Sequence, residues 1–581
     1  MRILDSRRLT GPSLLLDAPG AILEIALDGA DPERAIREWR SRLAALLGAL
    51  GWADAAVAAR AHAGGLSLAF SAPADTLYAA TEVNEAAWHA ASRALGGPAP
   101  EEGDESPEEV LTRLRAAVET ERKPWLLALG REAARRGITL LSDDKRVSVG
   151  LGRGSRAWPL EESEGLLDRI PWAEVSDVPA ALVTGTNGKT TSVRLLGAIA
   201  GAAGLVAGVT STDRVTVGDE VVATGDYSGP NGARTVLRDR RVQLALLEVA
   251  RGGILRRGLA LPHARAALVT NVANDHLGEY GIFDLDALAD VKLVVAKAVA
   301  RGGAVVLNAD DPRLAERGRR LATPVIWFSL NDDHPLLREH LANRGRACLL
   351  AGERLVYAAG GERRTITTVA ALPIALGGAA RYNVANALGV IGVAAALGLP
   401  EAAIRAGLEG FGGDAGSNPG RANVWRLSGV TVIVDFAHNP HGLTALAQTA
   451  AALPATRRGL VIGQAGDRDD EAIRELARAA WAMGPQHVFL KEMESFLRGR
   501  EPGAVTSVLE AELRRCGAPA AALSHWPGEI EAVRAALAWA RAGDLLVLTT
   551  HAQRGEVIAL MDRLAAAGWA PGREIPGPVV A

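Results

Sequence analysis

Cysteine is almost absent from this 581-residue chain, which contains only Cys348 and Cys516. Two cysteines cannot build a disulfide framework or a cysteine metal cluster, so we expect a reducing compartment, the cytoplasm. A large net charge is also absent, because 64 Lys and Arg residues face 67 Asp and Glu residues and leave a formal charge of −3. This balance gives no support for a nucleic-acid partner or an anionic membrane surface.

Long apolar runs are missing as well. The most apolar stretch, residues 388–399, is too short to cross a bilayer. Charged residues such as Asp5, Arg7 and Arg8 interrupt the N-terminus, which therefore has no continuous signal-peptide core. We expect a soluble protein with no membrane partner. A chain of this length is too long for one hydrophobic core, and about two to four domains are expected.

The most informative stretch that is present is a glycine-rich one at residues 185–191. It follows a short apolar run ending in Val183, which predicts a buried strand, and precedes residues 192–203, which predict a helix. A loop between strand and helix directs backbone amides and the positive helix end at one spot, which suits a phosphate. The predicted nucleotide-binding residues are Gly185, Thr186, Asn187, Gly188, Lys189, Thr190 and Thr191.

Within this loop, Lys189 supplies a cation for the β- and γ-phosphates, and the Thr190 hydroxyl can hold Mg²⁺. The standard phosphate-loop pattern has a glycine six positions before the lysine, where this chain has Val183. The match is therefore to a shorter version of the pattern. The alternative is a glycine-rich turn that binds no ligand.

Polar residues follow two further predicted strands. Residues 243–249 form an apolar run with Glu248 near its end, and residues 266–272 form another that leads to His276. A buried carboxylate is costly unless it is paired or bound to a metal. Because strand ends gather at one edge of an open α/β sheet, Glu248, His276 and Thr190 could surround Mg²⁺–ATP. Taken alone, His276 could equally be structural.

Three other features have both a functional and a structural interpretation. The strand at 304–308 leads into a polar turn, with Asn308 at its start, that could contact a nucleotide or merely cap a helix. A predicted helix at 287–299 carries Lys292, which by itself is most simply a surface lysine. A long helix opens at Arg381, where Asn383 and Asn386 share a face or simply cap the helix.

Alternating strands and helices predict an α/β protein with a mainly parallel central sheet. Residues 1–165 are expected to form a small N-terminal α/β domain with an acidic linker near 97–107. Residues 166–410 are expected to form a P-loop-type ATPase domain. Residues 411–581 are expected to form a Rossmann-like, doubly wound domain. The first of these contains strands at 21–27 and 65–70 and helices at 33–47 and 80–95, with no catalytic spacing of its own.

The order of these motifs along the chain resembles the Mur ligase family. The matching residues are the loop at 185–191, Glu248, the segment 270–276, Lys292 and the turn at 308–311. Three stretches, at 225–234, 248–256 and 275–278, are most similar to the Mur-like C-terminal half of cyanophycin synthetases. The resemblance covers residues 166–581 well and the first 165 residues weakly.

The resemblance implies roles in the central domain. Two Mg²⁺ ions would be bound by Thr190, Glu248 and His276. Lys292 stands where the family has a lysine that is carbamylated in many members, and a carbamate could help to hold the second ion. Asn386 would contact the adenine. One departure is Tyr382, which replaces the histidine of many Mur ligases.

The resemblance extends to the C-terminal region. Arg421 matches the arginine that reaches the γ-phosphate, and Asp435 matches a residue that faces the nucleotide. The segment 431–440 resembles a family motif, so His438 and Asn439 would lie at the cleft between domains. The remaining substrate candidates are Arg234, Arg498 and Arg500. The last two could bind a carboxylate through both nitrogens, although surface arginines are common.

Parts of cyanophycin synthetase have no counterpart here. Residues 149–156 resemble the start of its ATP-grasp half, but too few residues separate Arg156 from the strand at Ala181 for that domain to follow. We therefore expect no ligation that extends an aspartate backbone. The N-terminal hydrolase site of some relatives needs histidine, and the corresponding stretch, 76–88, has Glu82 and Glu85 but no histidine. We predict no hydrolase site there.

The sequence therefore predicts an ATP-dependent carboxylate–amine ligase that works through an acyl phosphate, with Lys189, His276, Lys292 and Arg421 as catalytic residues. It would add an amino acid to an amino-acid or peptide carboxylate in cyanophycin-like metabolism. A ligase for another peptide-like metabolite or poly-amino acid is one alternative, and a non-catalytic ATP-binding subunit is another. The predicted partners are the two substrates, further copies of the chain and a separate ATP-grasp ligase.

Overall fold

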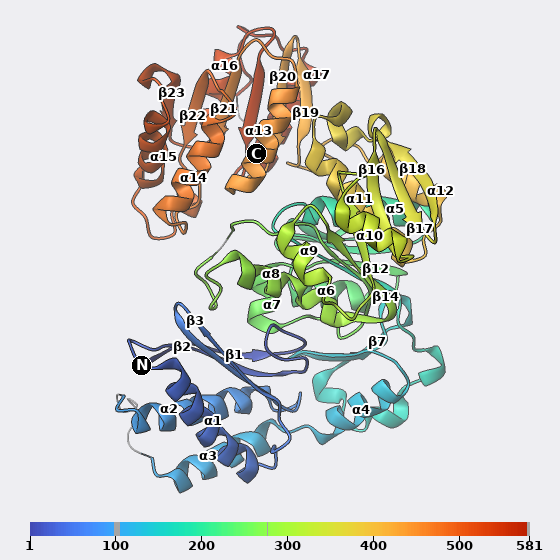
Figure 1. Cartoon of the computed structure of the whole chain (residues 1–581), viewed down its shortest axis with the longest axis vertical. Coiled ribbons are helices and arrows are strands. Elements are labelled where there is room, and N and C mark those ends of the chain that lie inside the picture. Colours follow the sequence, from blue (N-terminus) through green and yellow to red (C-terminus); the bar gives the residue numbers. More distant parts are fainter. Residues whose placement is uncertain (98–104, 276, 578–581) are drawn as a thin grey trace.

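Four β-sheets follow one another along the chain in a computed structural model that describes residues 1–97, 105–275 and 277–577 (Figure 1). Most of the expected linker near 97–107 lies outside these residues. After it, helix α3 (Pro107–Glu121) begins at an N-cap, Ser106, which exchanges hydrogen bonds with Glu109. This capping box fixes where the helix starts.

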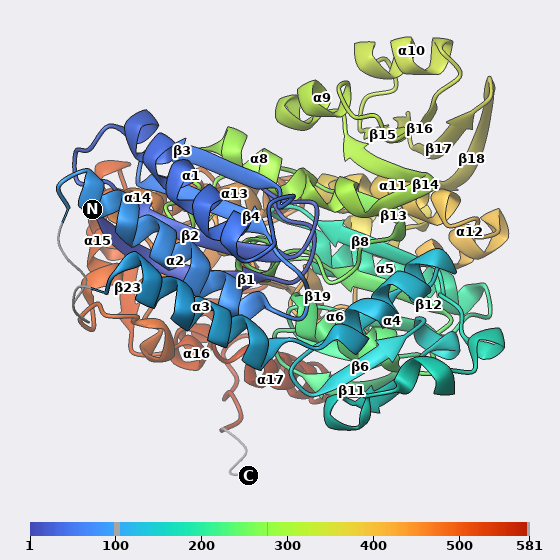
Figure 2. The ribbon, with the colours of Figure 1, turned by 90° about the horizontal axis from the view of Figure 1, so that it is seen from below.

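The N-terminal sheet is antiparallel, with strand order β1-β2-β4-β3. Its strands are β1 (Arg2–Leu9), β2 (Gly20–Ala26), β3 (Val57–His62) and β4 (Gly65–Ser71). Helices α1 (Pro32–Ala49) and α2 (Leu77–Ala94) bury Trp39 and Trp88 against it. Figure 2 shows α1, α2 and α3 on the face turned away from the central domain. The predicted strands and helices are confirmed, while β1 and β3, both at sheet edges, were not predicted.

A smaller unit links this sheet to the central one. Helix α4 (Pro124–Arg135) packs on an antiparallel sheet of β5 (Leu140–Ser142), β6 (Arg146–Val149) and β7 (Arg156–Pro159). Leu126 and Leu129 of the helix and Val147 and Val149 of β6 form its core. Short apolar runs in the sequence also predict strands at 138–141 and 147–151, and these correspond to β5 and β6.

The central sheet has eleven strands in the order β11-β10-β9-β12-β8-β13-β14-β15-β16-β17-β18. Neighbours from β9 to β16 pair in parallel, and the strands beyond them pair antiparallel. The mainly parallel sheet is therefore confirmed. The strands are β8 (Ala180–Thr184), β9 (Ala207–Thr210), β10 (Arg214–Val217), β11 (Glu220–Thr224), β12 (Leu244–Glu248), β13 (Ala264–Val269), β14 (Val299–Asn308), β15 (Val325–Ser329), β16 (Arg346–Ala351), β17 (Arg354–Ala359) and β18 (Glu362–Thr368).

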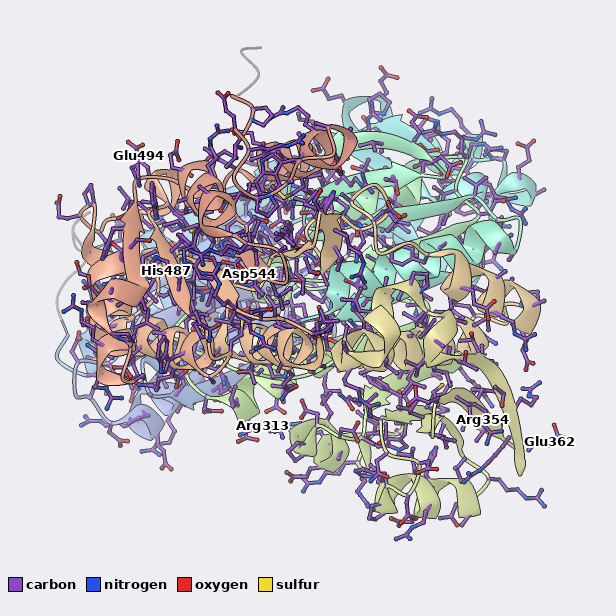
Figure 3. All side chains as sticks on the ribbon, turned by 90° about the horizontal axis from the view of Figure 1, so that it is seen from above. Arg313, Arg354, Glu362, His487, Glu494 and Asp544 are labelled. Carbon is purple, nitrogen blue, oxygen red and sulfur yellow. The ribbon has the colours of Figure 1, made fainter. Side chains whose placement is uncertain are left out.

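Helices cover both faces of this sheet. One face packs against α5 (Lys189–Ala202), α11 (Arg381–Ala396) and α12 (Glu401–Gly410). The other packs against α6 (Pro230–Arg238), α7 (Arg251–Arg257), α8 (Leu285–Leu293), α9 (Pro312–Gly318) and α10 (Pro335–Ala342). The predicted helix at 287–299 is wrong at its end, because α8 stops at Leu293 and a 3₁₀ turn continues to Ala298. Figure 3 shows Arg354 and Glu362 on the edge strands, away from the C-terminal domain.

The C-terminal sheet has the order β19-β20-β24-β21-β22-β23, and all its neighbours except β19 and β20 are parallel. Its strands are β19 (Asn423–Leu427), β20 (Val430–Asp435), β21 (Arg458–Ile462), β22 (His487–Lys491), β23 (Leu523–Trp526) and β24 (Leu545–Thr549). Helices α13 (Pro440–Ala452), α14 (Asp470–Trp481) and α15 (Ala504–Arg515) cover one face. Helices α16 (Glu529–Trp539) and α17 (Arg554–Ala566) cover the other. This arrangement confirms the doubly wound, Rossmann-like prediction.

Among the described residues, the helices are all too short or too polar to span a bilayer. The expected domain boundaries near residues 165 and 410 fall between sheets and remain predictions.

Candidate active site

The glycine-rich loop connects β8 to α5 and is shaped to receive an anion. Gly185 and Gly188 have φ angles of 144° and 87°, which side chains disfavour. A Cβ on Gly188 would lie 2.3 Å from the Asn386 side-chain oxygen. Gly188 is the N-cap of α5 and offers no capping side chain, so the first amides of the helix are left for a ligand.

Helix α5 begins at Lys189, three residues before the predicted start at Ser192, so the loop was predicted too long. The Lys189 ammonium donates to the carbonyls of Gly185 at 3.1 Å and Thr186 at 2.9 Å. The cation is thereby folded back over its own loop. The segment after β13 holds the loop in place, because the Asn271 side-chain oxygen accepts a hydrogen bond from the Asn187 backbone amide at 3.0 Å.

Glu248, at the end of β12, is buried beside the loop. Its Oε2 accepts from the Thr190 hydroxyl at 2.8 Å and from the Thr212 amide at 3.3 Å. Its Oε1 has no hydrogen-bond partner in the part of the chain that the structure describes. Burial raises the pKa of the Glu248 carboxyl above its ordinary value. An unpartnered carboxylate oxygen beside two threonine hydroxyls is a donor set that suits Mg²⁺, which prefers oxygen ligands.

The predicted third ligand, His276, lies outside the described residues. Within residues 1–97, 105–275 and 277–577, no group of three or more His, Cys, Asp or Glu side chains is arranged to hold a metal ion. The fit to Mg²⁺ therefore rests on Glu248 and the hydroxyls of Thr190 and Thr212. These two hydroxyls lie 3.1 Å apart.

Lys292, on α8, is 3% exposed and therefore not the surface lysine that its sequence context alone suggested. It makes no hydrogen bond or ion pair with any residue that the structure describes. Burial, together with the charge of Lys189, lowers the pKa of the Lys292 ammonium well below its ordinary value. The side chain is thus disposed to be a neutral amine.

The segment joining the central and C-terminal domains, residues 411–422, carries Arg421 and is called the hinge below. Its guanidinium lies over the Phe436 ring, 4.5 Å from the ring centre. Asp435, at the end of β20, is buried and accepts from the amides of Ala422 and Ala437, both at 2.7 Å. Burial raises the pKa of the Asp435 carboxyl. Both predicted residues therefore face the loop across the domain boundary.

A pair of asparagines joins the loop directly to the C-terminal domain. Asn187 and Asn439 each donate an amide hydrogen to the other's side-chain oxygen, both at 3.1 Å. Asn439 also accepts from the Gly442 amide at 2.8 Å and so caps α13. His441 lies 2.9 Å from the Asn187 side-chain nitrogen. The first turn of α13 is therefore held against the phosphate loop.

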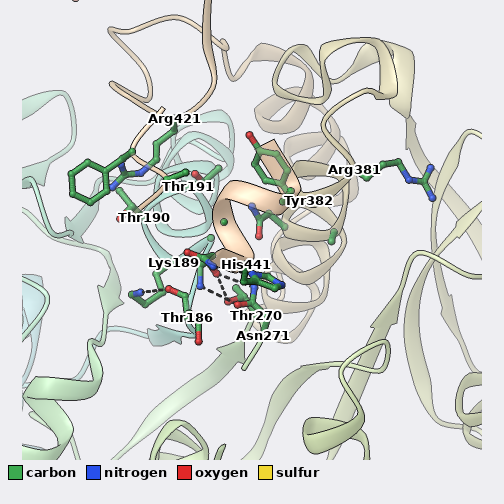
Figure 4. A pocket seen from close by; sticks show the side chains of 18 of the residues that line it. Thr186, Lys189, Thr190, Thr191, Thr270, Asn271, Arg381, Tyr382, Arg421 and His441 are labelled. Carbon is green, nitrogen blue, oxygen red and sulfur yellow. Dashed lines mark hydrogen bonds between the residues drawn. The ribbon is translucent and has the colours of Figure 1, made fainter. Parts of the chain in front are cut away.

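The loop from Thr186 to Thr191 lines one cavity of about 350 Å³ together with Glu248, Arg421, Asp435 and His441, a size suited to a small ligand. Figure 4 shows Arg421 beside Thr190 and Thr191, with Arg381 pointing away. Asp311 caps α9, which confirms the helix-cap interpretation for that residue, whereas Asn308 and Asp310 line the cavity and their contact with a nucleotide stays a prediction. Asn386 lines the cavity next to Gly188. The helix-cap alternative for Asn383 and Asn386 is wrong, because the N-cap of α11 is Ala380.

A second cavity, of about 1150 Å³, begins at Lys189 and Lys292 and extends to the N-terminal sheet. His438 lines both cavities. The larger one is rich in arginines: Arg7, Arg251, Arg256, Arg257, Arg468 and Arg498.

The three arginines predicted to bind substrate have different surroundings. Arg498 lines the larger cavity and pairs with Asp467. Arg500 pairs with Asp470 at 2.7 Å and donates to the carbonyls of Gly466 and Arg468, so it braces its own loop. Arg234 lines a separate cavity between the N-terminal sheet and α6. The structure does not bring Arg234 or Arg500 to the cavity around the loop.

Two family models match this chain. The Mur ligase middle domain matches residues 183–394, and the Mur ligase, glutamate ligase domain matches residues 420–551. Together they cover more than half of the chain, which therefore belongs to the Mur ligase family.

The relatives agree with the expected branch. Cyanophycin synthetase of Geminocystis herdmanii is 35% identical over 404 residues, which is 69% of this chain and 46% of that protein. A UDP-N-acetylmuramoyl-L-alanyl-D-glutamate–2,6-diaminopimelate ligase of Geobacter metallireducens is 27% identical over 55% of this chain and 64% of its own. The chain thus spans about half the length of the cyanophycin synthetases it matches. Among solved structures, E. coli FolC in complex with ADP is similar to this chain with a TM-score of 0.48 and 19% sequence identity. The match covers 66% of this chain and 89% of the FolC chain.

Sequence reasoning missed four residues at this site. Thr212 and Asp213 follow β9, and Asn271 follows β13, so the rule that polar residues at strand ends gather at one edge could have found them. His441 follows the recognised motif at 431–440 by one position. Its place beside Asn187 comes only from the approach of the two domains.

Proposed function

We propose that this protein is an ATP-dependent ligase that joins the carboxylate of one substrate to the amine of an amino acid. The observation that carries the proposal is the shared cavity, in which the phosphate loop, the buried Glu248 and Arg421 come from two domains and face one another. The family membership supports the use of ATP and Mg²⁺. The division into domains 1–165, 166–410 and 411–581 is part of the proposal.

The α5 amides and Lys189 would hold the phosphates of ATP. Lys189 would turn from the carbonyls of Gly185 and Thr186 to the phosphates, and Arg421 would meet the γ-phosphate from the opposite side. Both cations would stabilise the negative charge that develops as this phosphoryl group moves to the acceptor carboxylate. The resulting acyl phosphate is then attacked by the amine, phosphate leaves, and an amide bond remains.

Mg²⁺ would be held by Thr190 and Glu248, whose oxygens suit this ion, and by His276 as a predicted third ligand. When bound, Mg²⁺ would neutralise phosphate charge and polarise the transferring group. Two ions are proposed, with a carbamate on Lys292 as an added anionic ligand. Burial of Lys292 supports this, because only the neutral amine can react with CO₂.

Both substrates would enter through the larger, arginine-lined cavity. Arginines pair well with carboxylates, which supports an amino-acid or peptide acceptor in cyanophycin-like metabolism. His438 lines both cavities and Asn439 follows it in the chain, so closure around this segment would exclude water from the acyl phosphate. The separate ATP-grasp ligase, self-association and the cytoplasmic location remain predictions.

The test is ADP release from Mg²⁺–ATP against a panel of amino acids, with short aspartate peptides and cyanophycin fragments as acceptors. Mass spectrometry would show a product that contains both substrates joined by one amide bond. Lys189→Ala should lower the rate about 100-fold or more, by analogy with the loss of other charge-stabilising donors. Lys145→Ala, at an exposed turn, is the matched control. Product formation by Lys189→Ala at the wild-type rate would contradict the assigned site.

A further inference from the structure

One carboxylate lies among three guanidinium groups at the junction of the domains. Asp213, in the loop after β9, accepts from Arg194 at 2.8 Å and from Arg554 at 2.6 Å. The Arg421 guanidinium is 4.0 Å from the same carboxylate. Arg194 belongs to α5, Arg421 to the interdomain segment and Arg554 to α17. Asp213 therefore touches the phosphate-loop helix, the hinge and the C-terminal domain at once.

The cluster is largely withdrawn from water, since its four side chains are between 7% and 21% exposed. Burial by itself would raise the pKa of Asp213, but the three neighbouring guanidiniums together lower it. The carboxylate is thus ionised at neutral pH. One carboxylate lies among three guanidinium groups, so the cluster has a net positive charge. It can therefore bind a further anionic group.

The three arginines are held unequally. Arg194 and Arg554 make short hydrogen bonds to Asp213, whereas the Arg421 side chain, among the described residues, donates to the Gly420 carbonyl alone, at 3.3 Å. Arg421 and Arg554 also lie over the same ring, Phe436. Arg421 can therefore turn toward a phosphate while the other two contacts stay in place.

The loop that carries Asp213 is also fixed to the phosphate site. Its neighbour Thr212 contacts both Thr190 and Glu248. On the hinge, Asn418 accepts from Arg194 at 3.2 Å and donates to the Thr191 hydroxyl at 3.3 Å. The position of Arg421 relative to the loop is thus set by contacts on both sides of the hinge.

We propose that Asp213 is a positioning residue that docks the C-terminal domain through Arg554 and thereby places Arg421 at the terminal phosphate of the bound nucleotide. This inference rests on the proposed function, since it assumes that the cavity binds ATP. It assigns to one side chain the coupling between domain closure and recognition of the γ-phosphate.

Nucleotide binding tests the coupling without knowledge of the acceptor. Isothermal titration calorimetry would measure the dissociation constants of Mg²⁺–AMP-PNP and Mg²⁺–ADP for the full chain. The wild type should prefer AMP-PNP, because only it carries a γ-phosphate. Asp213→Asn should lower this preference at least fivefold. A purely structural ion pair would change thermal stability and leave the preference intact.

Arg554→Gln, a more exposed position, provides a second variant should Asp213→Asn fail to fold. It should lower the preference similarly, and the double variant should show no further loss, because both changes break the same contact. Asp286→Asn, which removes an exposed pairing with Arg317 elsewhere in the central domain, is the control and should behave as the wild type.

The outcomes separate the two levels of the argument. A wild type that binds neither nucleotide overturns the proposed function, and this inference with it. A wild type that prefers AMP-PNP while Asp213→Asn or Arg554→Gln retains that preference overturns the inference alone. The inference is also overturned if the double variant loses more of the preference for AMP-PNP than either single variant does. It is likewise overturned if the wild type binds both nucleotides equally.

Discussion

Glu248→Gln tests the metal site through a reversal of stability. Glu248 is 2% exposed, and one of its carboxylate oxygens has no partner among the described residues. Glutamine has nearly the same shape and can keep the hydrogen bond from Thr190, but it carries no charge. Without Mg²⁺, the variant should therefore be more stable than the wild type. With Mg²⁺, the order should reverse.

The gain without metal follows from the loss of a buried charge, because an unpartnered carboxylate costs more to bury than the neutral amide that replaces it. We take the difference as about 1–3 kcal/mol, the range for a buried polar group without its partner. A change of 1 kcal/mol shifts the melting temperature of a domain of this size by about 2–4 °C. In EDTA at pH 8 the variant should thus melt roughly 2–12 °C higher than the wild type, by these two ranges.

The difference in stability between the wild type and Glu248→Gln should depend on pH. The pKa of Glu248 is raised in the folded protein, so the folded state holds this proton more tightly than the unfolded state does. The contribution of Glu248 to wild-type stability is then greatest at low pH and falls as pH rises through the raised pKa. The advantage of the glutamine variant, which has no such proton, should shrink as the pH is lowered toward the ordinary carboxyl range.

Mg²⁺ should act in the opposite direction. At a concentration 1,000 times its dissociation constant, a ligand that binds only the folded state contributes about 4.1 kcal/mol, which exceeds the variant's advantage of about 1–3 kcal/mol without metal. This should raise the wild-type melting temperature by roughly 8–16 °C and leave Glu248→Gln unchanged. Differential scanning calorimetry in EDTA and in MgCl₂ would measure both effects.

A matched control is Glu512→Gln, since Glu512 is also buried but is fully paired with Arg478 and Arg515. It should lose stability equally with and without Mg²⁺. The reasoning would be refuted if Mg²⁺ stabilised the wild type and Glu248→Gln alike. It would also be refuted if the variant were the less stable protein in EDTA at pH 8.

Two further predictions concern buried lysines. Lys491, fully buried in the C-terminal domain, pairs with Glu529. Lys491→Met should cost about 3–5 kcal/mol because it removes the counter-charge of a buried carboxylate, although the amides of His551 and Gln553 still donate to it. An unchanged urea midpoint would contradict this. At Lys292, ¹³C-bicarbonate should produce a carbamate NMR signal in the wild type that Lys292→Ala loses and Lys145→Ala keeps. Absence of the signal in the wild type would count against carbamylation.

The sequence predicted best where hydrophobic pattern and local chemistry agree. The strands that lead to Thr184, Glu248 and Asn308 are continuous apolar runs, as buried parallel strands should be. The start of α5 was misplaced because Lys189, Thr190 and Thr191 lack the apolar spacing of a helix. They are helical because Gly188 caps the start of α5 directly before them and because Thr190 and Thr191 are buried in the fold.

Three of the missed strands share a different cause. β1, β3 and β11 lie at or near sheet edges and carry charged or half-buried residues at many positions. Their period of two is therefore blurred, and edge strands commonly contain such residues. Pattern alone cannot separate them from exposed loops, whereas pairing with a recognised neighbour strand identifies them at once.

Contacts between distant segments explain why the site itself was only partly foreseen. Arg554 reaches Asp213 across 341 positions, and Asn439 reaches Asn187 across 252. No local signal specifies these pairs, because they depend on how one sheet is docked on another. Yet Glu248 and Lys292, which the motifs did identify, are buried without full partners, a state that costs stability unless a ligand completes it. Both lie on the walls of cavities that meet at Lys189. The incompletely partnered Glu248 and Lys292 therefore lie at the same place as the unforeseen contacts between domains. This is the physical reason to assign the chemistry there.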